Sequence, residues 1–355
     1  MIRQKRVTRA KRVVLREIDR KQGIVTAMFV DTHQRIHNYL RISLTDNCNL
    51  RCSYCMPEEE YDFTPASRLM QVDEIVEIAK VFVAGGVNKI RLTGGEPLVR
   101  KDAGEIIERL SGLGVQLTMT TNATRVHLFI DAMKAAGMKK VNVSLDTLNA
   151  DTFILLTKRD LFEQVRSNID LLLAEGFEVK VNAVVMRGVN DHEILDFVRW
   201  SFSSGVHVRF IEFMPFEGNH WDNARVVTWQ QILLVVEAEF GGKIEEIARV
   251  PHETVKQYRL KGGAGTFAVI STMSAPFCGD CNRLRLTADG KMKNCLFSRG
   301  ETDLLGALRR GESIGPLIQA NVMAKAAALG GQFGTDLLSV VADDIVNRSM
   351  ITIGG

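Results

Sequence analysis

The six cysteines of this 355-residue chain fall into two triplets. Cys48, Cys52 and Cys55 form a C-x3-C-x2-C pattern directly after the first strand-like segment. The second triplet follows a C-x2-C-x13-C pattern in the last quarter of the chain and consists of Cys278, Cys281 and Cys295. Three thiolates are one fewer than the four that close a structural zinc site or an iron–sulfur cluster. Each triplet therefore predicts a metal centre with one open coordination position, where a substrate can bind.

The composition is that of a globular protein, with 46% hydrophobic and 25% charged residues. The length suffices for one large α/β domain and a smaller one. A net charge of +3 does not favour a nucleic-acid-binding protein, and no apolar run approaches the roughly 18 residues that span a bilayer. Cysteines in a cytosolic type of chain are more often metal ligands than disulfides. We therefore expect a cytoplasmic metalloprotein that binds neither membranes nor nucleic acids.

The beginning of the chain is strongly basic. Residues 1–21 carry nine Lys and Arg against two acidic residues and lack the apolar stretch of a signal peptide. We interpret residues 1–35 as a basic, poorly ordered N-terminal extension. A nucleic-acid-binding arm and an organelle-targeting segment remain as alternatives.

Strand-like and helix-like segments alternate between residues 38 and 214. The predicted strands are 39–45, 89–93, 115–121, 140–145, 178–185 and 206–213. Between them apolar residues recur at three- and four-residue steps, as in Val72, Ile75, Val76 and Ala79. Six successive βα units predict a parallel sheet, because each crossover helix returns the chain to the same edge.

Most of the predicted strands alternate between polar and apolar residues, whereas strands covered by helices on both faces are almost wholly apolar. The apolar faces are expected to pack under the helices. The polar faces, which include Arg41, Arg91 and Lys180, need water or a ligand because an unpaired buried polar group costs roughly several kcal/mol. We therefore predict an α/β fold in which residues 36–214 form a partial (βα)6 TIM-like barrel with a polar interior. A two-layer sheet with one wet face is the alternative.

The alternation stops after residue 213. The remaining predictions are a strand at 266–270, helices near 229–239 and 318–328, and a hairpin turn at 262–265. The sixth strand differs from the others in that both its faces are mixed. We interpret residues 215–355 as a smaller α+β domain that closes the open side of the barrel.

Two further motifs could bind ligands. Thr93-Gly94-Gly95-Glu96-Pro97 follows the second strand, where paired glycines let the backbone approach a ligand and proline holds the preceding glutamate extended. Near the second triplet, alternation puts Arg283 and Arg285 on one face. Two adjacent guanidinium groups repel unless an anion lies between them, and phosphate accepts their forked hydrogen bonds. For both triplets a zinc site remains an alternative, as a zinc loop and as a zinc knuckle with a basic rim.

Together these motifs resemble the GTP 3′,8-cyclase family of molybdenum cofactor biosynthesis (the molybdenum cofactor biosynthesis protein A family), within the radical S-adenosylmethionine (SAM) superfamily. The resemblance covers residues 38 to the C-terminus, and the second triplet followed by R-x-R is its most family-specific part. It implies one [4Fe–4S] cluster on each triplet, with SAM on the fourth iron of the first cluster. It departs at Asn122-Ala123, where the family usually has Asn-Gly.

The resemblance also implies ligand contacts. Those with SAM are Tyr54, Gly95, Glu96, Ser144 and Met214. Those with GTP are Arg41, Arg91, Thr120, Lys180, Arg283, Leu284 and Arg285. The residues with an implied catalytic role are Arg283, Arg285, Gly354 and Gly355. The two glycines are included because the Gly-Gly tail of the family enters the active site.

The activity implied is that of a lyase that converts GTP to (8S)-3′,8-cyclo-7,8-dihydroguanosine 5′-triphosphate, the first step of molybdopterin synthesis. A deoxyadenosyl radical would remove the ribose 3′ hydrogen, and the 3′ carbon would then attack C8 of guanine. The implied partners are GTP, a reductant protein, the next enzyme of the pathway and, in a homodimer, a second copy of the chain. Three alternatives remain: a peptide-modifying radical enzyme, a zinc-dependent RNA-binding or RNA-modifying protein, and a metal-stabilised scaffold.

Overall fold

A computed structural model describes residues 28–57, 61–248, 252, 255–332, 340 and 345–354 of the chain. Most of the predicted N-terminal extension, up to residue 27, and the predicted catalytic Gly355 lie outside the described residues.

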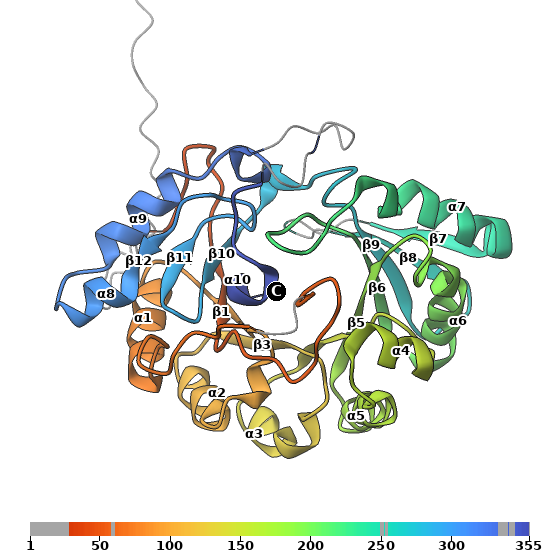
Figure 1. The fold of residues 1–355 in the computed structure, drawn as a ribbon, viewed down its shortest axis with the longest axis horizontal. Helices are drawn as coiled ribbons and strands as arrows, with labels where there is room; N and C mark the ends of the chain where they lie inside the picture. Colours follow the sequence, from red (N-terminus) through yellow and green to blue (C-terminus); the bar gives the residue numbers. More distant parts are fainter. Residues whose placement is uncertain are drawn as a thin grey trace, which may run out of the picture.

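The centre of the molecule is one curved sheet of twelve strands in the described residues, in the order β12-β11-β10-β1-β2-β3-β4-β5-β6-β9-β8-β7 (Figure 1). The strands are β1 (Tyr39–Ser43), β2 (Lys89–Thr93), β3 (Gln116–Thr121), β4 (Lys140–Ser144), β5 (Glu178–Val185), β6 (His207–Glu212), β7 (Ile244–Ile247), β8 (Lys256–Leu260), β9 (Thr266–Ile270), β10 (Arg283–Leu286), β11 (Lys291–Lys293) and β12 (Thr302–Asp303). From β10 to β9 every neighbouring pair is parallel, and the outer strands are antiparallel.

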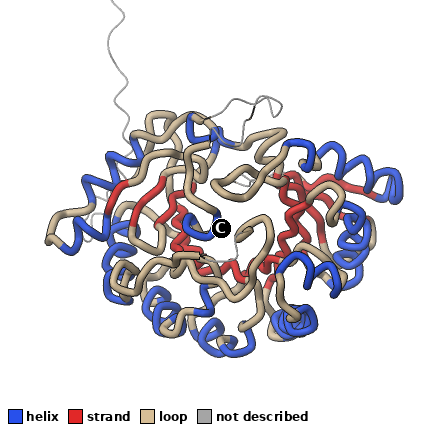
Figure 2. Tube along the Cα trace, viewed as in Figure 1, coloured by secondary structure: helices blue, strands red, loops and turns tan. Residues whose placement is uncertain are grey.

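Helices surround the outside of this curve, and the concave side is left to loops and to one short helix, α10 (Figure 2). The helices are α1 (Val72–Ala84), α2 (Ala103–Ser111), α3 (Ile130–Ala135), α4 (Ala150–Thr157), α5 (Phe162–Ala174), α6 (Ile194–Ser204), α7 (Trp229–Phe240), α8 (Leu304–Arg309), α9 (Gly315–Met323) and α10 (Met350–Ile353). This arrangement confirms the predicted partial barrel and excludes the two-layer alternative.

The predicted strands are confirmed to within one or two residues at each end, and β2, β5 and β9 have the predicted bounds. The helix predicted at 318–328 instead runs over Gly315–Met323. It begins early because Pro316 suits the first turn of a helix. It ends early because the chain beyond it turns inward, where the amine of Lys325 donates to the backbone oxygen atoms of Arg283 (2.9 Å) and Asn294 (2.6 Å).

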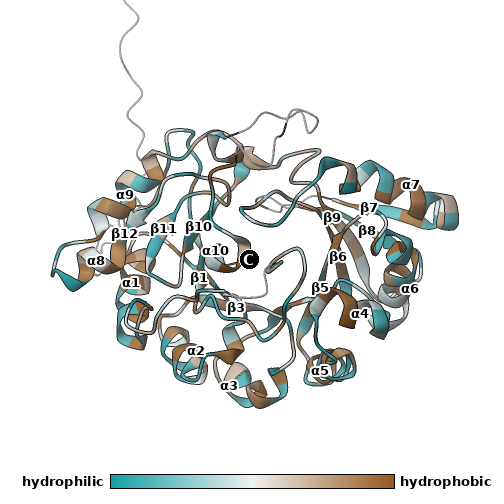
Figure 3. Cartoon of the chain, viewed as in Figure 1, coloured by the Kyte–Doolittle hydropathy of each residue, from teal (hydrophilic) through white to brown (hydrophobic). Residues whose placement is uncertain are grey.

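The alternation of the strands separates the core from the interior of the barrel. Leu40, Ile42, Ile90 and Leu92 are fully buried, and the outer helices carry both hydrophobic and hydrophilic residues (Figure 3). The opposite faces of the same strands carry the charged residues of the barrel interior. The strand alternation therefore predicted correctly which face is apolar core.

The sixth strand alternates as well, although its sequence suggested mixed faces. Val208, Phe210 and Glu212 are buried together on the core side. The carboxylate of Glu212 accepts hydrogen bonds from the backbone nitrogen atoms of Trp229, Met273 and Ser274, each at 2.9 Å. A charged residue occupies an otherwise apolar face there because backbone donors satisfy it.

The part of the chain after residue 214 extends the sheet at both edges. β9 pairs in parallel with β6, and β10 pairs in parallel with β1. α10 lies inside the curve of the sheet (Figure 1). The C-terminal residues thereby bring the second cysteine triplet and the end of the chain to the same opening.

The end of the predicted basic extension is packed. Phe29, Asp31, Arg35 and His37 are buried, and the carboxylate of Asp31 binds Arg35 Nε at 2.6 Å and His37 Nε2 at 3.0 Å. Arg35 Nη1 donates to the backbone oxygen of Cys278 at 2.8 Å. Residues 28–37 thus support the loop of the second triplet. No helix in the described part of the chain is long and apolar enough to cross a membrane.

Candidate active site

Three arginines form a row across neighbouring strands. Arg41 of β1 is the register partner of Arg91 on β2 and of Arg285 on β10. One step nearer the strand starts, Tyr39 is paired in the same way with Lys89 and Arg283. Neighbouring strands lie about 4.8 Å apart, and like charges on paired residues are destabilising. Such a row therefore indicates a binding site for an anion.

These residues line a cavity of about 410 Å³ inside the barrel, a size typical of small-molecule sites. It contains the predicted Arg41, Arg91, Lys180, Arg283, Arg285 and Met214, and all three cysteines of the second triplet. The cations Lys89, Lys140 and Arg209, to which the sequence analysis assigned no ligand, also line it. The described lining residues include no Asp or Glu. The cavity is thus built for a highly charged anion.

The positive charge around the cavity shifts the pKa values of its titratable groups. Burial alone would raise the pKa of Tyr39, but Arg91 and Arg41 outweigh it and lower that pKa to about 7. Burial and neighbouring cations lower the pKa of Arg209 to about 9 and that of Arg285 to about 10. Both shifts have the sign expected where burial and crowded positive charges outweigh the nearby acidic groups, such as Glu178 beside Lys180 at 3.1 Å.

Arg209 lines the cavity but was not among the predicted site residues. It lies on β6 beside Asn182 of β5, and its buried Nε and Nη2 atoms have no hydrogen-bond partner among the described residues. Two unsatisfied guanidinium nitrogen atoms facing a cavity are typical of a missing ligand. The alternation of β5 and β6 is the signal that could have found it, since Asn182 already lay on a recognised polar face.

The second triplet lies in a cationic environment. Lys325 Nζ is 3.6 Å from Cys281 Sγ. Burial alone would raise the pKa of Cys281, but Arg283 and Lys325 outweigh it and lower that pKa to about 6. Burial raises the pKa of Cys278. Cys281 is thereby prepared to act as a thiolate ligand.

The first triplet lies on a loop that α4 holds in place. The backbone nitrogen atoms of Arg51 and Ser53 donate to Thr157 and Leu156 of α4, both at 2.9 Å. The loop closes a cavity of about 180 Å³ that all three cysteines line. Burial raises the pKa of Cys48 to about 11 and that of Cys55 to about 12. These thiols need a bound cation in order to ionise, as metal ligands do.

Each triplet offers three sulfur donors to a metal centre. The all-sulfur donor sets suit iron–sulfur chemistry.

The Thr-Gly-Gly-Glu-Pro turn packs against the first cysteine loop. A Cβ atom on Gly95 would lie 2.5 Å from the backbone oxygen atoms of Asp46 and Asn47. Glu96 is extended, as predicted, but it is fully buried and absent from the described cavity linings. Its carboxylate accepts from Thr121 Oγ1 at 2.7 Å and from the backbone nitrogen of Asn122 at 2.6 Å. The observed contacts of Glu96 thus join the turn to the end of β3.

The other predicted contacts divide between the two cavities. Tyr54, Gly95 and Ser144 line the smaller cavity, where Tyr54 donates to Asp146 at 2.6 Å. Thr120, predicted for GTP, lines this smaller cavity as well, although Arg91 Nη1 reaches its hydroxyl at 3.2 Å.

Besides Glu96, two predicted residues line neither cavity. Leu284 is fully buried in the core. The carbonyl of Gly354 accepts a hydrogen bond from Arg285 Nη1 at 2.9 Å. The departure at Ala123 leaves its turn intact, because Ala123 adopts the left-handed φ of 61° that glycine adopts readily.

The two cavities adjoin. Asn182, Ile211 and Met350 line both of them. The triplets, which lie far apart in the sequence, therefore open onto neighbouring spaces inside one barrel.

Comparison with known proteins agrees with this geometry. Residues 42–201 match the model of the radical SAM superfamily, and residues 206–329 match that of the molybdenum cofactor synthesis C family. The chain is 44% identical to the mitochondrial GTP 3′,8-cyclase of Arabidopsis thaliana over 94% of its own length and 85% of the relative. This chain belongs to the GTP 3′,8-cyclase family. It is also 41% identical to the GTP 3′,8-cyclase of Rhodopirellula baltica, over 82% of this chain and 83% of that protein.

Other relatives of this GTP 3′,8-cyclase family member are longer. The chain is 41% identical to molybdenum cofactor biosynthesis protein 1 of Dictyostelium discoideum over 96% of its own length, but it spans about half of that protein (54%). Among solved structures, Streptococcus suis SuiB bound to S-adenosylmethionine is similar with a TM-score of 0.57 at 14% identity, over 88% of this chain and 73% of SuiB. That likeness shows the shared fold. Membership of the superfamily implies SAM and an iron–sulfur cluster as cofactors.

Proposed function

We propose that this chain is a GTP 3′,8-cyclase that carries two [4Fe–4S] clusters. The observation that carries the proposal is the cationic cavity, whose described lining includes no Asp or Glu. It holds the second triplet and adjoins the cavity of the first. The relatives named as GTP 3′,8-cyclases at 41–44% identity support it. A peptide-modifying radical enzyme is less well supported, because the cavity of about 410 Å³ is lined by eight Lys and Arg residues.

The charge of the cavity suits a nucleoside triphosphate. GTP carries close to four negative charges, and the predicted Arg41, Arg91, Lys180, Arg283 and Arg285 supply five positive ones. Each arginine can donate two parallel hydrogen bonds to phosphate oxygen atoms. We assign Arg209 and Lys89 to the same anion, because they line the same cavity. The chain needs no phosphate-binding glycine loop when side chains fix the triphosphate in this way.

The remaining roles follow the position of each residue. Cys48, Cys52 and Cys55 would hold the first cluster, which with bound SAM supplies the deoxyadenosyl radical. Tyr54, Gly95, Ser144 and Met214 would orient SAM. Cys278, Cys281 and Cys295 would hold the second cluster, which would supply an open iron position for the guanine base. The barrel walls would hold the ribose 3′ carbon near C8 and exclude water, since close positioning is the main contribution of such a site.

One experiment tests the activity and both clusters. The protein is reconstituted anaerobically and incubated with SAM, a reductant and GTP, and mass spectrometry follows 5′-deoxyadenosine and the cyclised nucleotide. Iron analysis should give about eight iron atoms per chain, falling to about four in Cys295→Ala. Deoxyadenosine without a cyclised nucleotide would refute the assigned substrate, and about four iron atoms in the unaltered protein would refute the second cluster.

The partners belong to the same proposal. We propose that a reductant protein supplies the electron, that the next enzyme of molybdopterin synthesis takes the product, and that the chain forms a homodimer in the cytoplasm. The Arabidopsis relative is named mitochondrial, so cell fractionation tests the compartment. Sedimentation analysis at several protein concentrations tests the dimer.

A further inference from the structure

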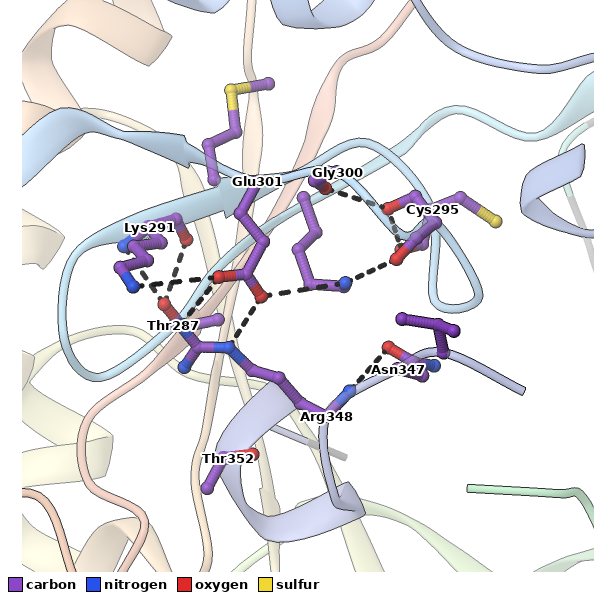
Figure 4. Close-up of polar contacts among 12 residues, drawn as sticks. Thr287, Lys291, Cys295, Gly300, Glu301, Asn347, Arg348 and Thr352 are labelled. Atoms are coloured by element: carbon purple, nitrogen blue, oxygen red, sulfur yellow. Dashed lines mark hydrogen bonds and ion pairs between the residues drawn. The ribbon is translucent and has the colours of Figure 1, made fainter. Parts of the chain in front are cut away.

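Arg348 is one of the residues that bind the segment before α10 to the wall of the barrel. Arg348 is 21% exposed and lies six residues before Gly354. Its Nη1 and Nη2 atoms each bind one carboxylate oxygen of Asp289 at 2.9 Å. Its Nη2 and Nε atoms bind the two oxygen atoms of Glu301 at 2.7 and 2.5 Å (Figure 4). This double fork requires a planar guanidinium, so a lysine cannot reproduce it.

The anchor points of Arg348 are themselves held in place. Asp289, in the turn between β10 and β11, accepts from Thr287 Oγ1 at 2.6 Å. Lys293, whose side chain is 1% exposed, lies 3.7 Å from Glu301 and donates to the backbone oxygen of Ser298 at 2.5 Å. The hydroxyl of Ser298 donates in turn to the backbone oxygen of Cys295 at 3.1 Å (Figure 4). The loop that carries Cys295 is thus also held by contacts that do not involve Arg348.

The residue before the arginine binds the same wall. Asn347 Nδ2 donates to the backbone oxygen of Leu296 at 2.9 Å. Two consecutive side chains near the C-terminus therefore hold the segment of residues 295–301. Gln332 binds the same two segments, because its side-chain amide hydrogen-bonds the backbone of Val346 at 2.9 and 3.1 Å and also donates to the backbone oxygen of Phe297.

The helix that follows forms part of the reaction space. Met350 of α10 lines both cavities, and Ile351 lines the smaller one. The Gly354 carbonyl accepts from Arg285, and a Cβ atom on Gly354 would lie 2.7 Å from Ser43 Cβ. A displacement of α10 would therefore change both cavities and release the contact with Arg285.

We propose that Arg348 is a positioning residue of the cyclase. Its bridges to Asp289 and Glu301 hold α10 between the two cavities and keep the Gly354 carbonyl at Arg285. In this arrangement the loop that carries Cys295 holds α10 in position. The expected change in catalytic activity rests on the proposed function.

The first test measures the turn itself. In the holoenzyme, Arg348→Ala should increase hydrogen exchange of the 350–354 amides on the order of tenfold, with no loss of iron. The control is Arg310→Ala, which removes an arginine that is 59% exposed and paired with Glu312, and it should leave exchange unchanged. Unchanged exchange in Arg348→Ala would overturn the proposal. A loss of iron in step with activity would also overturn it, because the arginine would then hold the metal centre.

The second test uses catalysis. Arg348→Ala should lower kcat on the order of 100-fold, with a much smaller change in KM. In a chain lacking residues 354 and 355 the same substitution should add no further loss, because both changes act through the tail. Independent, multiplicative losses would overturn the proposal.

A milder variant covers the case in which Arg348→Ala does not fold. Glu301→Gln keeps the shape of the side chain and removes half of the ionic bridge, so it should shift exchange and kcat in the same direction by a smaller factor. Wild-type values for both in Glu301→Gln would count against the proposal. Hydrogen exchange does not depend on the substrate, so its outcome stands even if GTP cyclisation is not found.

Discussion

Arg41 and Arg285 are register partners on the neighbouring parallel strands β1 and β10, although they come from opposite ends of the chain. Burial and the charge of Arg285 both lower the pKa of Arg41. A folded protein keeps two like charges together in this way where a ligand of opposite charge uses them. The pairing of these two strands therefore creates the anion site, and it also brings the second cysteine triplet to the barrel.

Removing the second arginine pair should separate the two ligands. Arg283→Ala combined with Arg285→Ala should weaken GTP binding about 100-fold or more, because each charge-assisted hydrogen bond to phosphate contributes about 1.5–3 kcal/mol. SAM affinity should stay at the wild-type value, since most of its predicted contacts line the smaller cavity. Isothermal titration with each ligand measures both. Arg199→Ala, at an exposed ion pair with Glu239, is the control, and full turnover by the double variant would contradict the assigned role.

Tyr39 should report on the occupancy of the anion site. Its pKa of about 7 lies below the ordinary value of 10.0, so the absorbance of the phenolate should rise near neutral pH in wild type and not in Tyr39→Phe. Because the pKa is lower in the folded state, this ionisation adds stability as the pH rises from about 7 to about 10. The contribution is lost as the pH falls through 7.

The same residue gives a test of anion binding. GTP brings negative charge beside the phenolate, so saturating GTP should raise the pKa of Tyr39. Ultraviolet difference titration with and without GTP measures this shift. A midpoint near 10 without ligand would show that the cationic field is absent.

Gly95 should be essential for the first metal centre, even though it is no metal ligand. A methyl group there would lie 2.5 Å from the backbone of the cysteine loop, so Gly95→Ala should displace that loop. We expect a loss of about 1–3 kcal/mol in the free energy of unfolding and a loss of about half of the bound iron. Chemical denaturation and iron analysis measure these effects.

The matched control for Gly95 lies in α2. The nearest atom to a Cβ on Gly104 is a side-chain carbon at 4.0 Å, so Gly104→Ala should fit. Alanine favours a helix over glycine by about 1 kcal/mol, and this variant should therefore be more stable than wild type. Full iron content in Gly95→Ala would refute the close packing described above.

Lys325 should tune the second metal centre. Its amine lies 3.6 Å from Cys281 Sγ, and removing a positive charge disfavours the more negative, reduced state of a cluster. Lys325→Met should therefore lower the midpoint potential of the second cluster, on the order of 60 mV if the loss is about 1.4 kcal/mol. Redox titration followed by electron paramagnetic resonance measures the potential. The exposed Lys101→Met is the control, and equal potentials in both variants would show that Lys325 has no electrostatic effect there.

The sequence was sufficient for the barrel and for its polar interior face. Period-two alternation located the strands and the polar face that carries Arg41, Arg91 and Lys180, because side chains of a strand point to opposite sides by covalent geometry. The cysteine spacing predicted two open metal centres, because the three cysteines of each triplet lie close together in the sequence. Glu96 and Arg209 show the limits of this approach. Glu96 is a polar residue that hydrogen bonds hold in the interior of the protein. Arg209 is a cavity residue on β6, a strand whose core face also carries a glutamate.

Only the tertiary structure decided how these parts meet. Strand pairing joins β10 to β1, and no local pattern encodes which distant strand completes an edge. It places Arg285 beside Arg41, the second triplet beside the first, and the C-terminal turn between them. Each of these contacts joins residues far apart in the chain, and their geometry follows from the closure of the whole sheet.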